Sequence, residues 1–225
     1  MSALAVVRQL LWKDLVLEVR TREILTAMTV FAMLVAVVFN FAFSPSPQDA
    51  LRLLPGMLWV TLAFASTLGL SRSFVLERDQ QCLEALRLFP FDPGLIYAGK
   101  LLSNLLALLA VEILLLPAFA VIAGVALLGH IGALAAVLLL GSVGLVAVGT
   151  LFSAMSVHTR IREVLLPVLL FPLAAPVLIS GVRATLGILA GRPWADVLPG
   201  VRLLVAFDVI FVVVGYLIFE YVVEE

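Results

Sequence analysis

The sequence predicts an all-α membrane protein with six transmembrane helices and little mass outside the bilayer. Of its 225 residues, 64% are hydrophobic and only 13% are charged. A soluble globular domain has roughly 25% charged residues and about half apolar ones, so one water-soluble core could not hide this excess. Because about 20 apolar residues in a helix cross the hydrocarbon layer, six apolar runs predict six spans. These are residues 24–43, 53–70, 101–128, 131–155, 164–181 and 203–222.

Residues 1–23 precede the first span and predict a separate amphipathic helix. Within residues 4–19 the apolar side chains gather roughly on one helical face, with polar ones opposite. That apolar face comprises Leu4, Leu11, Trp12, Leu15 and Val19. Such a helix lies in the membrane interface. We therefore divide the chain into an interfacial N-terminal helix, 1–23, and a six-helix transmembrane domain, 24–225.

The connection between the second and third spans, residues 72–100, is far longer than a tight loop requires. Val75, Cys82, Leu86 and Phe89 recur near helical spacing, which predicts a helix outside the membrane. Pro90 would end it, and Asp92-Pro93 has the residue types of an N-cap and first helical position. The polar side of such a helix fits a protein partner, and a helix resting on lipid is the alternative.

Four later features predict turns, helix packing and an irregular segment. Gly129-His130 predicts a tight turn between the third and fourth spans. Small residues in the fourth span predict close helix packing; they are Gly141, Gly144, Gly149 and Ser153. Prolines in the fifth span predict either a hinge or a bent packing element; they are Pro167, Pro172 and Pro176. Residues 183–200 are mixed in character and predict a short outer helix or a re-entrant piece.

The distribution of Lys and Arg predicts that both termini are cytoplasmic. With the N-terminus inside, ten basic residues fall in the inner segments and four in the outer ones. The inner set is Arg8, Lys13, Arg20, Arg22, Arg72, Arg78, Arg87, Lys100, Arg160 and Arg162. The outer set is Arg52, Arg183, Arg192 and Arg202.

No catalytic constellation is visible in the sequence, and we predict no catalytic, cofactor-binding or metal-binding residues. Cys82 is the single cysteine, and His130 and His158 lie too far apart for a metal signature. Residues 94–101 fit a phosphate-binding loop except at the last position, where Leu101 replaces the Ser or Thr that would hold Mg²⁺. We therefore expect neither enzyme activity nor ATP hydrolysis from this chain.

Three polar residues within the apolar runs are candidate functional residues, because a charge at mid-span costs roughly 2.5–3.5 kcal/mol. Glu112 lies near the middle of its run, and Asn40 and Asp208 lie toward the outer side. They predict either a substrate or gating path, or hydrogen bonds that hold the bundle together.

Several stretches, taken in order along nearly the whole chain, resemble one family. The sequence is similar to CcmB, the haem exporter protein B permease of bacterial cytochrome c maturation, and more broadly to ABC-2 type exporter permeases. The stretches are residues 22–24, 38–43, 55–60, 70–74, 77–78, 96–102, 111–112, 148–151, 162–167, 206–211 and 219–221.

The resemblance implies half of an ABC-2-like exporter permease in the bacterial cytoplasmic membrane, paired with a second copy. A separate CcmA-like cytoplasmic ATPase would bind ATP and dock on a coupling helix around Glu77, Arg78, Glu84 and Arg87. CcmC- and CcmD-like membrane proteins would join the complex, and its work would be haem export or release of the haem-loaded chaperone, a CcmE-like protein. Haem would be cargo of the complex rather than a cofactor of this chain.

Two alternatives stay open at this point. An ion-coupled secondary transporter would use Glu112 and Asp208 as an ion path and would work without an ATPase. A non-transporting membrane scaffold for cytochrome assembly would leave ATP hydrolysis in the complex unaffected by damage to its membrane core.

Overall fold

The computed structural model is a bundle of long helices, and it describes residues 2–43, 47–79, 92–124, 128–156 and 162–224. Within these ranges there are seven α-helices, a single 3₁₀ turn and no strand. The helices are α1 (Ala3–Thr21), α2 (Glu23–Phe43), α3 (Pro47–Asp79), α5 (Pro93–Ala123), α6 (Ile131–Ser156), α7 (Arg162–Leu189) and α8 (Trp194–Glu224); the turn is η1 (Leu128–His130).

Six helices are long and apolar enough to cross a membrane, as the sequence predicts. The candidate spans are Glu23–Phe43, Leu51–Ser73, Pro93–Val121, Ile131–Ser156, Val164–Leu189 and Trp194–Val222. The chain is therefore an all-α, multi-pass membrane protein.

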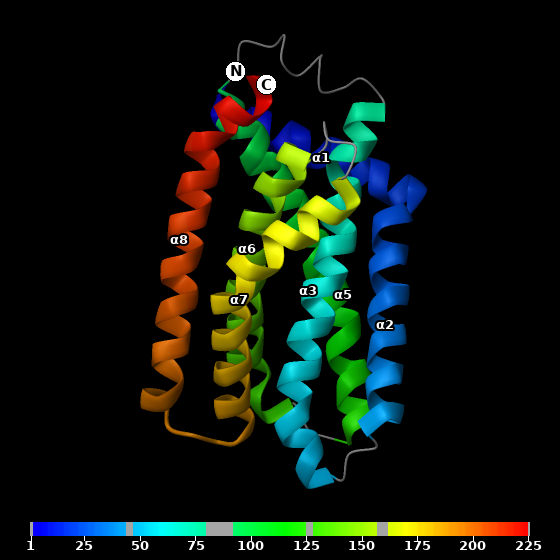
Figure 1. Cartoon of the computed structure of the whole chain (residues 1–225), viewed down its shortest axis with the longest axis vertical. Helices are drawn as coiled ribbons and strands as arrows, with labels where there is room; N and C mark the ends of the chain where they lie inside the picture. Colours follow the sequence, from blue (N-terminus) through cyan, green and yellow to red (C-terminus); the bar gives the residue numbers. More distant parts are fainter. Residues whose placement is uncertain (1, 44–46, 80–91, 125–127, 157–161, 225) are drawn as a thin grey trace.

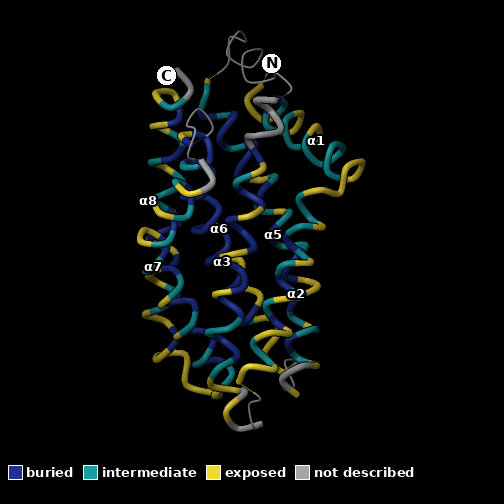
Figure 2. Tube along the Cα trace, turned by 45° about the vertical axis from the view of Figure 1, so that its right-hand side comes forward, coloured by how far each residue is buried: buried dark blue, intermediate teal, exposed yellow. Residues whose placement is uncertain are grey.

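The six spans run along the long axis of the molecule, and α1 lies across the end at which both termini are found (Figure 1). Helices α2 and α8 form opposite edges of the bundle. Helix α6 lies between them and packs against α3, α5, α7 and α8. Buried residues follow the middle of the bundle, and exposed ones follow its rim (Figure 2). Several buried polar residues, among them Glu112 and Asn104, make their contacts with α6.

The small residues of α6 do allow close packing, as predicted. Trp59 of α3 lies against Gly141 of α6 and Gly181 of α7, where an added Cβ would come within 2.0 and 2.4 Å of its ring atoms. The indole Nε1 donates a hydrogen bond of 3.0 Å to Thr185 Oγ1 on α7. Leu70 fills the corresponding space at Gly149. One large aromatic side chain thus connects three spans.

Helix α7 continues through all three of its prolines as one helix. Its first part is inclined relative to its second part (Figure 1), as expected where proline removes a donor and its ring displaces the preceding turn. The arrangement is that of a bent packing helix, with Leu166, Leu170 and Val177 buried against the bundle. Hinge motion at these prolines stays a prediction.

Three helix boundaries differ from the sequence-based ones. Residues 183–200 form neither a separate outer helix nor a re-entrant piece, because α7 continues to Leu189 and α8 begins at Trp194. Helix α5 ends at Ala123 rather than continuing to residue 128, since Gly124 adopts a left-handed conformation, φ 63°, that terminates it. The connection to α6 is correspondingly longer than a Gly129-His130 turn and includes η1.

Candidate functional site

The predicted coupling segment, residues 72–100, is divided between two spans and a part outside the described residues. Helix α3 extends to Asp79 and includes Glu77 and Arg78, of which the backbone is described. Glu84 and Arg87 lie outside the described residues. Helix α5 begins at Pro93, and the Asp92 side chain accepts a hydrogen bond of 2.8 Å from Gly94 N. The N-cap and first helical position predicted at Asp92-Pro93 are therefore confirmed.

Both described ends of this segment are attached to other spans. On the α3 side, Arg72 forms an exposed ion pair with Glu23 at the start of α2. On the α5 side, the Tyr216 hydroxyl of α8 donates a hydrogen bond of 2.6 Å to Asp92 Oδ2. Tyr216 also packs so closely that a Cβ at Gly94 would lie 2.6 Å from its ring. Both edge helices, α2 and α8, are therefore attached to described residues of the predicted coupling segment.

A buried ion pair attaches α1 to α5 at the same end of the bundle. Lys100 Nζ lies 2.8 Å from Asp14 Oδ2, and the two side chains are only 6% and 13% exposed. Lys13 lies 3.0 Å from the other oxygen of Asp14. Burial alone would raise the pKa of Asp14, but the positive charges and hydrogen bonds of Lys100 and Lys13 outweigh it and hold that pKa below its ordinary value. Asp14 is therefore ionised and paired at neutral pH.

The α1 face that contacts the bundle is different from the apolar face that the sequence shows. Val6 is buried, and Leu10 lies so close to α5 that a Cβ on Gly99 would come within 2.9 Å of it. By contrast Leu4, Trp12 and Val19 are exposed, which suits the interfacial role predicted for that face. Glu18 adds a second attachment by accepting a 2.8 Å hydrogen bond from Leu25 N.

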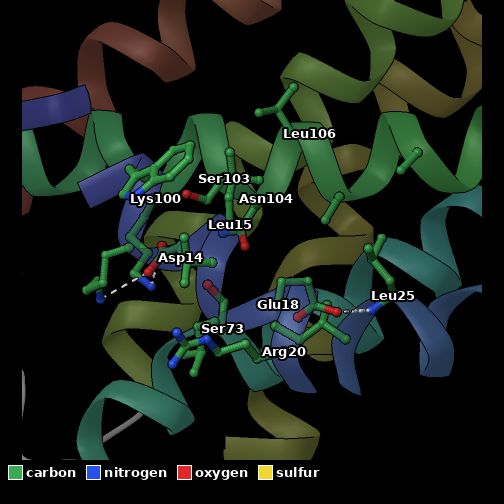
Figure 3. Close-up of a pocket in the computed structure, with 17 residues that line it drawn as sticks. Asp14, Leu15, Glu18, Arg20, Leu25, Ser73, Lys100, Ser103, Asn104 and Leu106 are labelled. Carbon is green, nitrogen blue, oxygen red and sulfur yellow. Dashed lines mark hydrogen bonds and ion pairs between the residues drawn. The ribbon is translucent and has the colours of Figure 1, made fainter. Parts of the chain in front are cut away.

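Between α1, α2, α3 and α5 lies a cavity of about 410 Å³ (Figure 3). Asp14 and Lys100 point toward one another at its edge, and Glu18 reaches Leu25 on its other side. Ser73 of α3 and Ser103 and Asn104 of α5 also line it. Sequence patterns give no sign of this cavity, since its walls come from four segments without a shared motif.

Glu112 and Asp208, the predicted intramembrane carboxylates, both reach α6 but from different helices. Glu112 is 4% exposed, and its Oε1 accepts a hydrogen bond from the Ser142 hydroxyl. Asp208 is 7% exposed and lies against Gly144. Ser142 and Gly144 are two residues apart, which is roughly 200° around a helix. The structure therefore does not bring the two carboxylates together along one side of α6.

The three intramembrane polar residues differ in their partners. Glu112 of α5 is hydrogen-bonded to α6. This fits the interpretation in which the intramembrane polar residues hold the bundle together. Neither carboxylate oxygen of Asp208 has a hydrogen bond within the described part of the chain. Asn40 is half-buried near the end of α2.

Two further polar contacts between spans could not be selected from the sequence. The Tyr97 hydroxyl of α5 donates to Ala147 O of α6 at 3.0 Å, and Asn104 Nδ2 donates to Thr150 Oγ1 at 3.1 Å. In the ranges that the structure describes, no group of three His, Cys, Asp or Glu side chains is placed to hold a metal ion. The buried polar groups are thus concentrated on helix contacts with α6 and on the cavity under α1.

The similarity to known proteins covers almost the entire chain. A family model described as CcmB protein matches residues 5–224. The chain belongs to the CcmB family. The Heme exporter protein B of Pseudomonas aeruginosa is 31% identical over 174 residues, which is 77% of each chain. Its counterpart in Bradyrhizobium diazoefficiens is 28% identical over 161 residues, 72% of each chain. That of Rhodobacter capsulatus is 29% identical over 174 residues, 77% of this chain and 79% of the relative.

The described flanks of the predicted coupling segment and the buried ion pair of this CcmB chain lie at one end of the bundle. The two flanks of the predicted coupling segment lie in α3 and α5 at the end where both termini lie. The ion pair of Asp14 with Lys100 and the cavity beside it are at the same end, next to the first residues of α5. Within the described residues, this end of the CcmB chain carries the ion pairs of Arg72 with Glu23 and of Lys100 with Asp14.

Proposed function

We propose that this chain is the membrane permease subunit of an ABC-type complex in haem trafficking and cytochrome c maturation. Membership of the CcmB family over residues 5–224 carries the proposal, and relatives named Heme exporter protein B support the haem assignment. A separate CcmA-like ATPase subunit would bind and hydrolyse ATP. The complex would lie in the bacterial inner membrane, with both termini of this chain in the cytoplasm.

The contacts of Arg72 and Asp92 support a coupling role for residues 72–100. Arg72 is held by Glu23 of α2, and Asp92 is held by Tyr216 of α8. Force applied between these two anchors would reach both edges of the bundle. In the proposal, ATP-driven closure of the ATPase pushes on the segment that includes Glu77, Arg78, Glu84 and Arg87. The bundle then changes conformation to export haem or to release a haem-loaded CcmE-like chaperone.

The assembly that this requires has further members. A second copy of the chain would complete the permease, and CcmC- and CcmD-like proteins would join in the membrane. The exposed apolar residues of α8, among them Val205, Val209 and Val213, offer a lipid- or protein-facing side for such neighbours. Haem would be the cargo of the complex, with no residue of this chain assigned as its ligand.

The first test replaces Glu84 and Arg87 together with Ala. If they dock the ATPase, the double variant loses most of the ATPase that co-purifies with the wild-type chain in mild detergent. Arg192→Ala with Asp196→Ala is the matched control, because it removes one exposed acid and one exposed base at the turn between α7 and α8. Equal recovery of ATPase with both double variants would contradict the coupling role of residues 84 and 87.

The same preparation separates the proposal from its alternatives. Stoichiometric recovery of a small ATPase, with haem or a CcmC-like protein, supports the proposed complex. Transport by the chain reconstituted alone, driven by an ion gradient, would instead favour the secondary transporter. ATP hydrolysis that survives disruption of the bundle, for example by Trp59→Ala, would favour the scaffold.

A further inference from the structure

The cavity under α1 has a gradient of polarity along the membrane normal. From Lys100 to Ala110, its α5 wall is about 15 Å long. The first part of that wall carries Lys100, Ser103 and Asn104, and the second part carries Leu106, Ala107 and Ala110. Ile24 and Leu25 add apolar surface from the start of α2. A ligand that satisfies both parts must have a polar end and an apolar end.

The charged residues around the cavity favour an anionic polar end. Lys13, Arg20 and Lys100 line it together with Asp14 and Glu18, which gives a net charge of one positive. Asp14 pairs with Lys100 and Lys13, and Glu18 accepts from Leu25 N, so both acids and both lysines already have partners. Arg20 is exposed, and it makes no ion pair within the described residues.

The way into the cavity lies on the bilayer side. Leu106, in its apolar wall, is 41% exposed, and Trp12 at its α1 edge is 69% exposed. Leu106 lies within the candidate span Pro93–Val121, whereas Trp12 belongs to α1 outside the spans. Aromatic rings such as that of Trp12 favour the headgroup region. A molecule already in the membrane can therefore enter sideways, with its apolar part along α5 and its charge beside α1.

We propose that this cavity binds the anionic headgroup and glycerol portion of a membrane phospholipid, with the acyl chains extending along α5. The bound lipid would fill the space between α1 and the bundle and add a contact between Arg20 and α5. This inference does not depend on the proposed transport function, because it concerns lipid binding by the chain itself.

The test uses the chain in nanodiscs of phosphatidylcholine and phosphatidylglycerol, with retained lipid measured by native mass spectrometry after transfer to detergent. Arg20→Gln should lower the ratio of retained phosphatidylglycerol to phosphatidylcholine about fivefold, which corresponds to about 1 kcal/mol per basic residue near a membrane surface. Arg8→Gln is the matched control, since Arg8 is an exposed arginine of α1 that does not line the cavity. Equal ratios in the two variants would overturn the proposal.

A second variant tests the cavity itself. Ala110→Phe places a ring in the apolar wall and should abolish phosphatidylglycerol retention, whereas Ala136→Phe on an exposed face of α6 should not. Retention by Ala110→Phe equal to that of Ala136→Phe would contradict the site. Displacement of the lipid by inorganic phosphate would indicate a site for a free anion, and a visible chromophore lost only in Ala110→Phe would indicate a pigment site; either result overturns lipid binding.

Discussion

Asp14 shows how one buried residue attaches a peripheral helix to a membrane bundle. Its carboxylate accepts from Lys100 of α5 and from its own neighbour Lys13. Because both charges have been taken out of water, the intact pair adds little net stability. Removal of one partner is nevertheless strongly destabilising, since the other charge is then buried alone. The consequence for function is positional: α1 is held against α5 at Lys100, the last residue of the predicted coupling segment.

Asp14→Asn should destabilise the protein by roughly 3 kcal/mol, because it leaves the Lys100 ammonium without its carboxylate partner in a buried place. Thermal unfolding in detergent at neutral pH measures this loss. Asp196→Asn, at the opposite end and exposed, is the control and should change stability little. A neutral result for Asp14→Asn would show that the ion pair does not hold α1.

The same pair predicts a dependence on pH. The folded-state pKa of Asp14 lies below its ordinary value of 3.8, so the pair contributes fully above pH 3.8 and is lost as pH falls through the lowered pKa. The stability difference between the wild type and Asp14→Asn should therefore be constant from neutral pH down to about pH 4. Below that it should shrink toward zero. A difference that persists unchanged in strong acid would contradict the assignment.

At the scale of elements, α6 owes its central position to residues without bulky side chains. Gly141 receives the ring of Trp59, Gly149 receives Leu70, and Gly144 receives Asp208 and Phe207. Without a hydrophobic force between helices in lipid, such close packing is a main source of their association. The same small residues permit the Glu112 and Asn104 side chains to reach Ser142 and Thr150.

Gly141→Ala should destabilise the bundle by about 1–3 kcal/mol, the usual range for overpacking a full interior. The new Cβ would lie 2.0 Å from Trp59, which would have to move. Gly132→Ala on the same helix meets nothing within 4 Å, so the gain in helix propensity should leave that variant neutral or slightly more stable. Unfolding midpoints in detergent compare the two, and a neutral Gly141→Ala would mean that Trp59 has room to shift.

The helices and helix starts that could be predicted from the sequence are those determined by the residues within the same stretch of chain. Six apolar runs fix six spans, and the Asp92-Pro93 pair marks the start of α5. The predicted boundaries were wrong at residues 183–200, whose mixed character suggested a short outer helix or a re-entrant piece. Helix α7 instead continues to Leu189, and α8 begins at Trp194. Contacts such as Asp14 with Lys100 could not be predicted, because neither helix carries a pattern that identifies its partner.

At the scale of the whole molecule, contacts at one end involve α1, α2, α3, α5 and α8. Arg72 with Glu23 joins α3 to α2, Lys100 with Asp14 joins α5 to α1, and Tyr216 with Asp92 joins α8 to the start of α5. In the proposed coupling mechanism, these side chains are the contacts through which the predicted coupling segment would act on the bundle.

Tyr216→Phe should weaken that transmission without preventing ATPase docking. It keeps the ring beside Gly94 and removes the hydrogen bond to the Asp92 carboxylate, a contact worth roughly 1.5–3 kcal/mol. In the purified complex, ATP hydrolysis should lose most of its dependence on the membrane subunit while the amount of bound ATPase is unchanged. Tyr221→Phe, at an exposed tyrosine of the same helix, should behave as wild type. Full retention of coupling by Tyr216→Phe would contradict a path through α8.

The attachment of α1 to α5 also has a consequence for how the chain is made. Asp14 is synthesised early, but its partner Lys100 belongs to the third span and leaves the ribosome only after two earlier spans have been completed. Until then α1 can contact only the start of α2, through Glu18 and Leu25, and its exposed Leu4, Trp12 and Val19 would hold it at the membrane surface. Docking of α1 on α5 is thus expected only after the span that carries Lys100 has entered the membrane.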